Sequence, residues 1–199
     1  MKTNSALLII DVQNDFCPGG GLPVPEGDAV VPLLNRYIEF FRSQALPIFA
    51  SRDWHPATTT HFRDYGGIWP AHCVRETEGA RFHPELGLPY DAIIISKGKD
   101  PSRDDYSAFQ GVTENGVPLS VALKEIGIRR IYVGGLATDY CVKESVLDAL
   151  RHGLSVTLLE DAVRGVDLNP GDSERAINAM TAAGAACMTV DQVEAELAR

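Results

Sequence analysis

The stretch ALLIIDV, residues 6–12, is an apolar run that carries one aspartate, Asp11, near its end. A short continuous apolar run of this kind is typical of a β-strand that is buried on both faces of a sheet. Similar runs recur along the chain at residues 47–53, 92–97, 130–136, 155–160 and 186–190. The sequence therefore predicts six strands, and runs that are apolar on both faces favour a parallel sheet.

Segments with helical spacing alternate with these strands. Residues 28–43 place apolar side chains three and four positions apart, which is the period of one helix face. Further helices are predicted at residues 118–126, 140–152, 172–183 and 191–198. Strands that alternate with helices predict an α/β fold with three layers, in which helices cover both faces of the sheet. We expect one domain over residues 1–199.

Composition and charge argue against a nucleic-acid-binding protein and against a membrane-spanning one. The chain has 199 residues, a net charge of −9 and an isoelectric point near 5.0, so it lacks the basic footprint of a nucleic-acid binder. No apolar run approaches the roughly 18 residues of a membrane span. The first residues predict a strand and not a secretory signal, so we expect a cytoplasmic protein. The four cysteines, which form no CxxC pair, are then expected to be free thiols.

Residues 54–91 break the alternation of strands and helices. A segment this long without regular structure is expected to be a functional loop that something else organises. Asp53, His55, His61 and His72 lie in or just before it, and carboxylate with imidazole suits zinc, iron or manganese. The alternative is a polar loop whose histidines bind neighbouring backbone groups. His83 and His152 lack clustered partners and are expected to be structural.

Reactive side chains follow four of the predicted strands. Asp11, Asp53 and Lys97 each stand at a strand end, and Cys141 follows the run at 130–136 near the start of a helix. Ligands bind at the carboxyl ends of strands in open parallel sheets, so these groups are expected to meet there. A cation and a helix N-terminus can lower the pKa of a thiol, and a carboxylate can take its proton. The alternative for Cys141 is a small buried apolar residue.

Several motifs together resemble the nicotinamidase family of isochorismatase-like cysteine hydrolases. They are DVQNDFCPGG at 11–20, DWHP at 53–56, WPAHCV at 69–74, SKG at 96–98, DYSAF at 105–109 and GGLATDYCVKES at 134–145. Each motif is modest alone, but the combination is specific, and the resemblance extends from residue 6 to about 165.

The resemblance implies a role for each matched position. Asp11, Lys97 and Cys141 match the catalytic triad, and Phe16 and Trp69 match aromatic walls around a pyridine ring. The matched metal ligands are Asp53, His55 and His72, together with His61, which corresponds to a ligand found in only some members. Ala137 and Cys141 match the oxyanion hole, and the family has a cis peptide at the position of Leu136–Ala137. The implied sheet order is 3-2-1-4-5-6.

The implied activity is the metal-dependent deamidation of nicotinamide to nicotinate and ammonia through a cysteine thioester, a step of NAD salvage. Pyrazinamide is implied as a side substrate, and one divalent ion (zinc, iron or manganese) as the cofactor. No nucleic-acid or membrane partner is expected, and a homo-oligomer stays open. Two alternatives remain: a metal-free relative that acts on another small amide or on isochorismate, and a non-enzymatic metal-binding or interaction protein.

Overall fold

The computed structural model describes residues 4–198 and contains one sheet of six parallel strands. The strand order is β3-β2-β1-β4-β5-β6, which confirms the predicted order. The strands are β1 (Ser5–Ile10), β2 (Ile48–Asp53), β3 (Ile93–Lys97), β4 (Arg130–Leu136), β5 (Ser155–Arg164) and β6 (Ala186–Met188).

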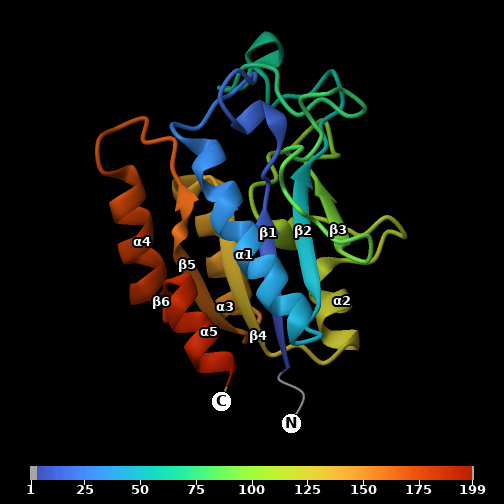
Figure 1. Cartoon of the computed structure of the whole chain (residues 1–199). Helices are drawn as coiled ribbons and strands as arrows, with labels where there is room; N and C mark the ends of the chain where they lie inside the picture. The colour runs from blue at the N-terminus through green and yellow to red at the C-terminus, as the bar shows by residue number, and fades with distance from the viewer. Residues whose placement is uncertain (1–3, 199) are drawn as a thin grey trace.

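Helices lie on both faces of this sheet (Figure 1). They are α1 (Val30–Ser43), α2 (Leu119–Glu125), α3 (Lys143–Arg151), α4 (Asp172–Ala182) and α5 (Val190–Leu197). Apolar residues of α1 and α5 share one buried cluster, and those of α2, α3 and α4 share a second cluster on the opposite face. The three-layer α/β/α prediction is thereby confirmed.

The position of β1 in the sheet explains why residues 6–10 have no polar face. Its side chains alternate across the sheet, so Leu7 and Ile9 pack in the cluster with α1 while Leu8 and Ile10 pack in the other cluster. All four are almost completely buried, because β1 lies between β2 and β4 with a helix layer on each side. The strand ends at Ile10, and Asp11 adopts a left-handed φ of 49° that turns the chain out of the sheet.

Two predicted boundaries were wrong near the end of the chain. β5 continues to Arg164 instead of stopping at residue 160, and it resumes pairing with β4 after a register shift near Gly135. β6 ends at Met188 instead of reaching residue 190, because Thr189 and Gln192 form a capping box that starts α5 at Val190.

The helix predicted to start at residue 140 begins differently. Its first turn is a π-helical segment over Thr138–Val142, and α3 follows directly at Lys143. The carbonyl of Ala137 accepts hydrogen bonds from the N–H groups of Tyr140 and Val142, both at 3.1 Å. The turn therefore skips the N–H of Cys141, the residue between them.

The segment between β2 and β3 has little regular structure, as predicted, with a short 3₁₀ turn at Arg63–Tyr65. It gathers with other loops at the carboxyl end of the sheet, at the top of Figure 1. All four cysteines are free thiols, as predicted. Within residues 4–198, no helix is long and apolar enough to cross a membrane.

The close approach of β4 to β1 can be tested with two glycines that both have a positive φ. A Cβ at Gly135 would lie 2.1 Å from the carbonyl oxygen of Ile10, whereas a Cβ at Gly127 would meet nothing within 4 Å. We expect Gly127→Ala to lower the free energy of unfolding by about 1–2 kcal/mol through backbone strain alone. Gly135→Ala adds the steric clash and should lower it by more than about 3 kcal/mol. Equal losses in denaturant unfolding would contradict the packing described for β4.

Candidate active site and metal centre

A buried lysine lies at the centre of the cluster at the carboxyl end of the sheet. The Nζ of Lys97 lies 2.9 Å from Oδ2 of Asp11, 2.6 Å from Oδ1 of Asp53 and 3.4 Å from Sγ of Cys141. All four residues are buried. The Oγ of Ser51 donates a hydrogen bond of 2.7 Å to Oδ1 of Asp11, which fixes the orientation of that carboxylate. The structure thus brings the predicted aspartate, lysine and cysteine into contact.

Lys97 reaches Asp11 across an intervening strand. β2 lies between β3 and β1, and neighbouring strands are about 4.8 Å apart, so a short side chain on β3 could not reach Asp11. Asp53 is the register partner of Lys97 at the end of β2. The lysine side chain therefore passes over Asp53 and contacts both carboxylates, which needs its full four-carbon length.

Burial and charge act in opposite directions on the ionisable groups of this cluster. Burial raises the pKa of Asp11, and the nearby Lys97 opposes this only in part. For Asp53, burial would raise the pKa, but Lys97 and the neighbouring histidines lower it below its usual range. The pKa of Lys97 is raised well above its usual value, because the two carboxylates outweigh the effect of burial.

Cys141 corrects one expectation from the sequence. We expected Lys97 and the helix N-terminus to lower the pKa of this thiol. Lys97 does act in that direction, but burial raises the pKa of Cys141 well above its usual value, with Asp11 and Asp53 adding to the effect. Burial thus favours the neutral thiol. The carboxylate of Asp11, the carboxylate of Asp53 and the sulfur all lie within 4.8 Å of one another.

The backbone before Cys141 has the predicted unusual geometry. The Leu136–Ala137 peptide bond is cis. The first N–H groups of a helix generally lack partners within that helix, and Cys141 lies in the first turn, where the Ala137 carbonyl bonds to Tyr140 and Val142 instead. Ala137 and Cys141 both line the same cavity. Their N–H groups are thus candidates for binding an oxygen atom of a ligand.

Three histidines from the irregular segment lie together beside this cluster. His55, His61 and His72 are buried, and each offers a nitrogen within 4.8 Å of the others. The Nδ1 atoms of His55 and His72 face the carbonyl oxygens of Gly98 and Pro70, at 3.1 and 2.8 Å. A carbonyl only accepts, so Nδ1 carries the proton and Nε2 is left with its lone pair. The Nδ1 of His61 faces the carboxylate of Asp104 in the same manner.

This donor set fits a divalent metal ion. The Nε2 of His55 is buried without a hydrogen-bond partner, and Oδ2 of Asp53 lies 3.6 Å from it and 4.0 Å from Nε2 of His72. Burial lowers the pKa of His61 and lowers that of His72 to about 4, which keeps both in the neutral form that metals bind. The outer hydrogen bonds of the three imidazoles are typical of metal-binding histidines. The second group of potential ligands, Asp11, Asp53 and Cys141, already holds the cation of Lys97.

A small, mostly apolar cavity joins the thiol to the histidines. Phe16 and Trp69, the two predicted wall residues, both line it. The indole Nε1 of Trp69 donates a hydrogen bond of 3.0 Å to the hydroxyl of Tyr106, and the ring of Trp69 packs edge-on against Tyr140 with ring centroids 5.0 Å apart. The cavity therefore has aromatic walls, with Cys141 and two of the three histidines, His61 and His72, at its surface.

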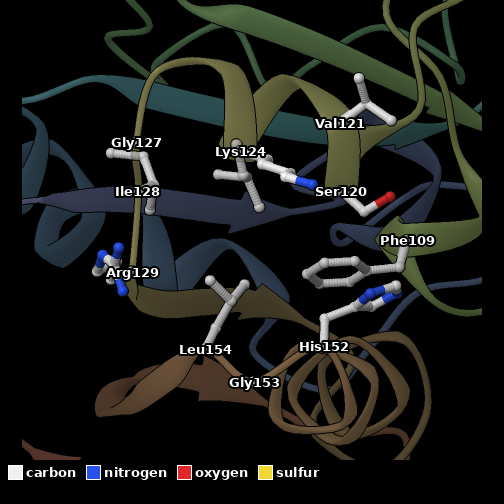
Figure 2. A pocket seen from close by; sticks show the side chains of 11 residues that line it. Phe109, Ser120, Val121, Lys124, Gly127, Ile128, Arg129, His152, Gly153 and Leu154 are labelled. Carbon is white, nitrogen blue, oxygen red and sulfur yellow. The ribbon is translucent and has the colours of Figure 1, made fainter.

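A wider groove, of about 610 Å³, lies elsewhere (Figure 2). It opens where α2 and α3 end, and the rings of Phe109 and His152 stack there with centroids 5.0 Å apart. Lys124 and Arg129 also line it. Basic groups beside helix C-termini complement the partial negative charge of those ends, so the groove needs no ligand to explain its composition. His152 lies outside the histidine cluster, and its structural role stays a prediction.

Some cavity residues were not singled out from the sequence. Tyr106 and Asp105 belong to the DYSAF motif, and both line the cavity. The sequence alone indicates no role for either residue. Leu22, Val24 and Val166 complete the walls. Their apolar character carries no local signal that distinguishes them from core residues, so only the fold shows their place.

Comparisons with known proteins identify the family of this chain. Residues 5–192 match the model of the isochorismatase domain family. The chain belongs to the isochorismatase family. It is 43% identical to a nicotinamidase of Escherichia coli over 93% of this chain and 94% of that protein. It is 40% identical to a nicotinamidase/pyrazinamidase of Mycobacterium tuberculosis over 81% of this chain and 87% of that protein.

A solved structure of this family shows the same fold. The pyrazinamidase of Pyrococcus horikoshii in complex with zinc superposes with a TM-score of 0.87 at 46% identity, and the match covers 94% of this chain and 99% of that one. The family predicted from the sequence motifs is therefore confirmed.

The histidine cluster can be tested without reference to activity. We expect the purified chain to bind one zinc ion, and His72→Ala to weaken the binding by at least about 10-fold, since even outer partners of metal ligands matter by 10–100-fold. His83→Ala is the matched control, because His83 is outside the cluster and accepts a hydrogen bond from the N–H of Glu85. Competition with a chromophoric chelator measures both affinities, and equal affinities would remove His72 from the metal site.

Proposed function

We propose that this chain is a metal-dependent amidohydrolase that converts nicotinamide and water to nicotinate and ammonia, with pyrazinamide as a side substrate. The observation that carries the proposal is the contact of Lys97 with both Asp11 and Cys141, beside an apolar cavity with aromatic walls. The nicotinamidases to which the chain is similar support the substrate. Nicotinate formed in this reaction would serve NAD salvage.

The thiol of Cys141 is the proposed nucleophile, and Asp11 the proposed base. Asp11 takes the proton from Sγ, and the sulfur attacks the carboxamide carbon. The tetrahedral intermediate collapses as Asp11 returns the proton to the leaving nitrogen, which departs as ammonia. Water then attacks the thioester as Asp11 takes one of its protons, the C–S bond breaks, and Asp11 returns that proton to Sγ as the product leaves as nicotinate. Lys97 holds the carboxylate of Asp11 in place and stabilises the thiolate as it forms.

The N–H groups of Ala137 and Cys141 are proposed to bind the oxyanion of the intermediate. Donors aimed at the place where charge develops contribute about 2.7–4 kcal/mol each in other enzymes. The π-helical turn supports this role, because the Ala137 carbonyl accepts from the N–H groups of Tyr140 and Val142 and not from that of Cys141. Phe16 and Trp69 are proposed to hold the pyridine ring between them.

Asp53, His55, His61 and His72 are proposed to hold the divalent ion, and residues 54–91 form the insertion that carries the three histidines. When bound, the ion would bind the ring nitrogen and so orient the carboxamide toward Cys141. Orientation of reacting groups can lower a barrier by roughly 7–11 kcal/mol at the extreme. The zinc complex of the similar pyrazinamidase supports a divalent ion. Zinc, iron and manganese all suit these ligands.

The proposal is tested by ammonia release from nicotinamide, pyrazinamide and benzamide, with and without a metal chelator. Nicotinamide and pyrazinamide should be hydrolysed, and chelation should reduce both rates strongly. Benzamide keeps the carboxamide but lacks the ring nitrogen, so it should be a poor substrate whose slow turnover is much less sensitive to chelation. Equal proportional losses for all three amides would show that the ion does not act through the ring nitrogen.

Cys141→Ala separates the proposed enzyme from a non-enzymatic protein of the same fold. It should reduce turnover of nicotinamide by a factor on the order of 10³ or more, while nicotinamide still binds through the aromatic walls and the ion. Activity above a tenth of the parent value would remove Cys141 from the nucleophile role. A parent protein that binds zinc but releases no ammonia from any amide would favour the non-enzymatic alternative.

A further inference from the structure

Gln13 is a buried polar residue to which the proposed reaction gives no role. Its side chain is completely buried and makes three hydrogen bonds. Its Oε1 accepts from the N–H of Asp53 at 2.7 Å, and its Nε2 donates to the carbonyls of Asp53 and Ala80, both at 2.8 Å. Both amide hydrogens and the oxygen are therefore used, and two of the three bonds go to the backbone of Asp53.

The side-chain amide of Gln13 takes the place of a β1 peptide group beyond the point where β1 has left the sheet. The last ladder bond from β1 runs from the N–H of Asp11 to the carbonyl of Ser51, at 3.1 Å. Asp11 then turns the chain away with its left-handed φ. The next N–H and C=O on the same edge of β2 belong to Asp53, and the amide of Gln13 occupies the place where a strand would have paired with them.

Asp53 is the residue that both halves of the site share. One carboxylate oxygen is 2.6 Å from Nζ of Lys97, and the other is 3.6 Å from Nε2 of His55. Its own N–H and C=O both bond to Gln13, while the N–H of the next residue, Trp54, donates to the carbonyl of Lys97 on β3 at 2.9 Å. A shift of this backbone would move the carboxylate relative to both neighbours at once.

We propose that Gln13 is a positioning residue, whose side-chain amide holds the Asp53 backbone so that its carboxylate faces Lys97 and the histidine cluster together. The inference rests on the proposed metal site. The bond to the Ala80 carbonyl also ties this point to the irregular segment, so Gln13 connects the end of β1, the end of β2 and the loop that carries the histidines.

The test compares Gln13→Met with Tyr37→Phe. Methionine has nearly the length and volume of glutamine but makes none of the three hydrogen bonds. Tyr37→Phe also removes a side-chain hydrogen bond, the partly buried 2.8 Å contact with Asp161, but on α1 and away from the cavity. Both variants should unfold at a lower temperature than the parent. Only Gln13→Met should bind zinc at least about 10-fold more weakly in chelator competition, the scale known for outer partners of metal ligands.

A second variant covers the case in which Gln13→Met does not fold. Gln13→Asn keeps the amide but is one methylene shorter, so it cannot span both bonds to Asp53, and it should also weaken zinc binding. The inference is overturned if a folded Gln13 variant binds zinc as the parent does while its unfolding temperature falls like that of Tyr37→Phe. Failure of the parent itself to bind zinc would instead overturn the proposed metal site, so the two failures are distinguishable.

Discussion

The contact between one buried ammonium group and two buried carboxylates organises this molecule. The Nζ of Lys97 lies 2.9 Å from a carboxylate oxygen of Asp11 and 2.6 Å from one of Asp53, and all three residues are buried. Burying a charge is costly unless it is paired, and removing one partner of a buried pair typically destabilises a protein by about 3–5 kcal/mol. The three strands β3, β2 and β1 must therefore keep their order and register, because only that arrangement brings the three charges together at the carboxyl edge.

The same contact joins the two parts of the site. Asp11 and Lys97 face the thiol of Cys141, whereas Asp53 turns its second oxygen toward the histidines. Burial favours the neutral form of this thiol, which is why the proposed reaction needs Asp11 as a proton acceptor. The irregular segment after β2 then has a physical reason for its length. It must carry three imidazoles and an aromatic wall from one strand end back over the same sheet edge.

The sequence predicted the layers, the strand order and the groups that meet, but not how they meet. Continuous apolar runs such as 6–12 determine which segments are buried, and the motif residues lie at strand ends in any fold of this kind. The direction of the pKa of Cys141 could not be predicted, because it depends on whether burial outweighs Lys97. The π-helical turn depends on a hydrogen bond that skips one residue, and the role of Gln13 depends on the turn at Asp11. No sequence pattern predicts either feature.

The most direct measurement of the central claim is the free energy of unfolding of Lys97→Met, alone and combined with Asp11→Asn, in the presence of a metal chelator. Methionine keeps most of the length of the side chain but leaves two buried carboxylates without a cation, so the single variant should lose about 3–5 kcal/mol. The double variant removes one of those charges and should recover a large part of the loss, although neither protein should hydrolyse nicotinamide. A single variant as stable as the parent, or a double variant no more stable than the single one, would contradict the account.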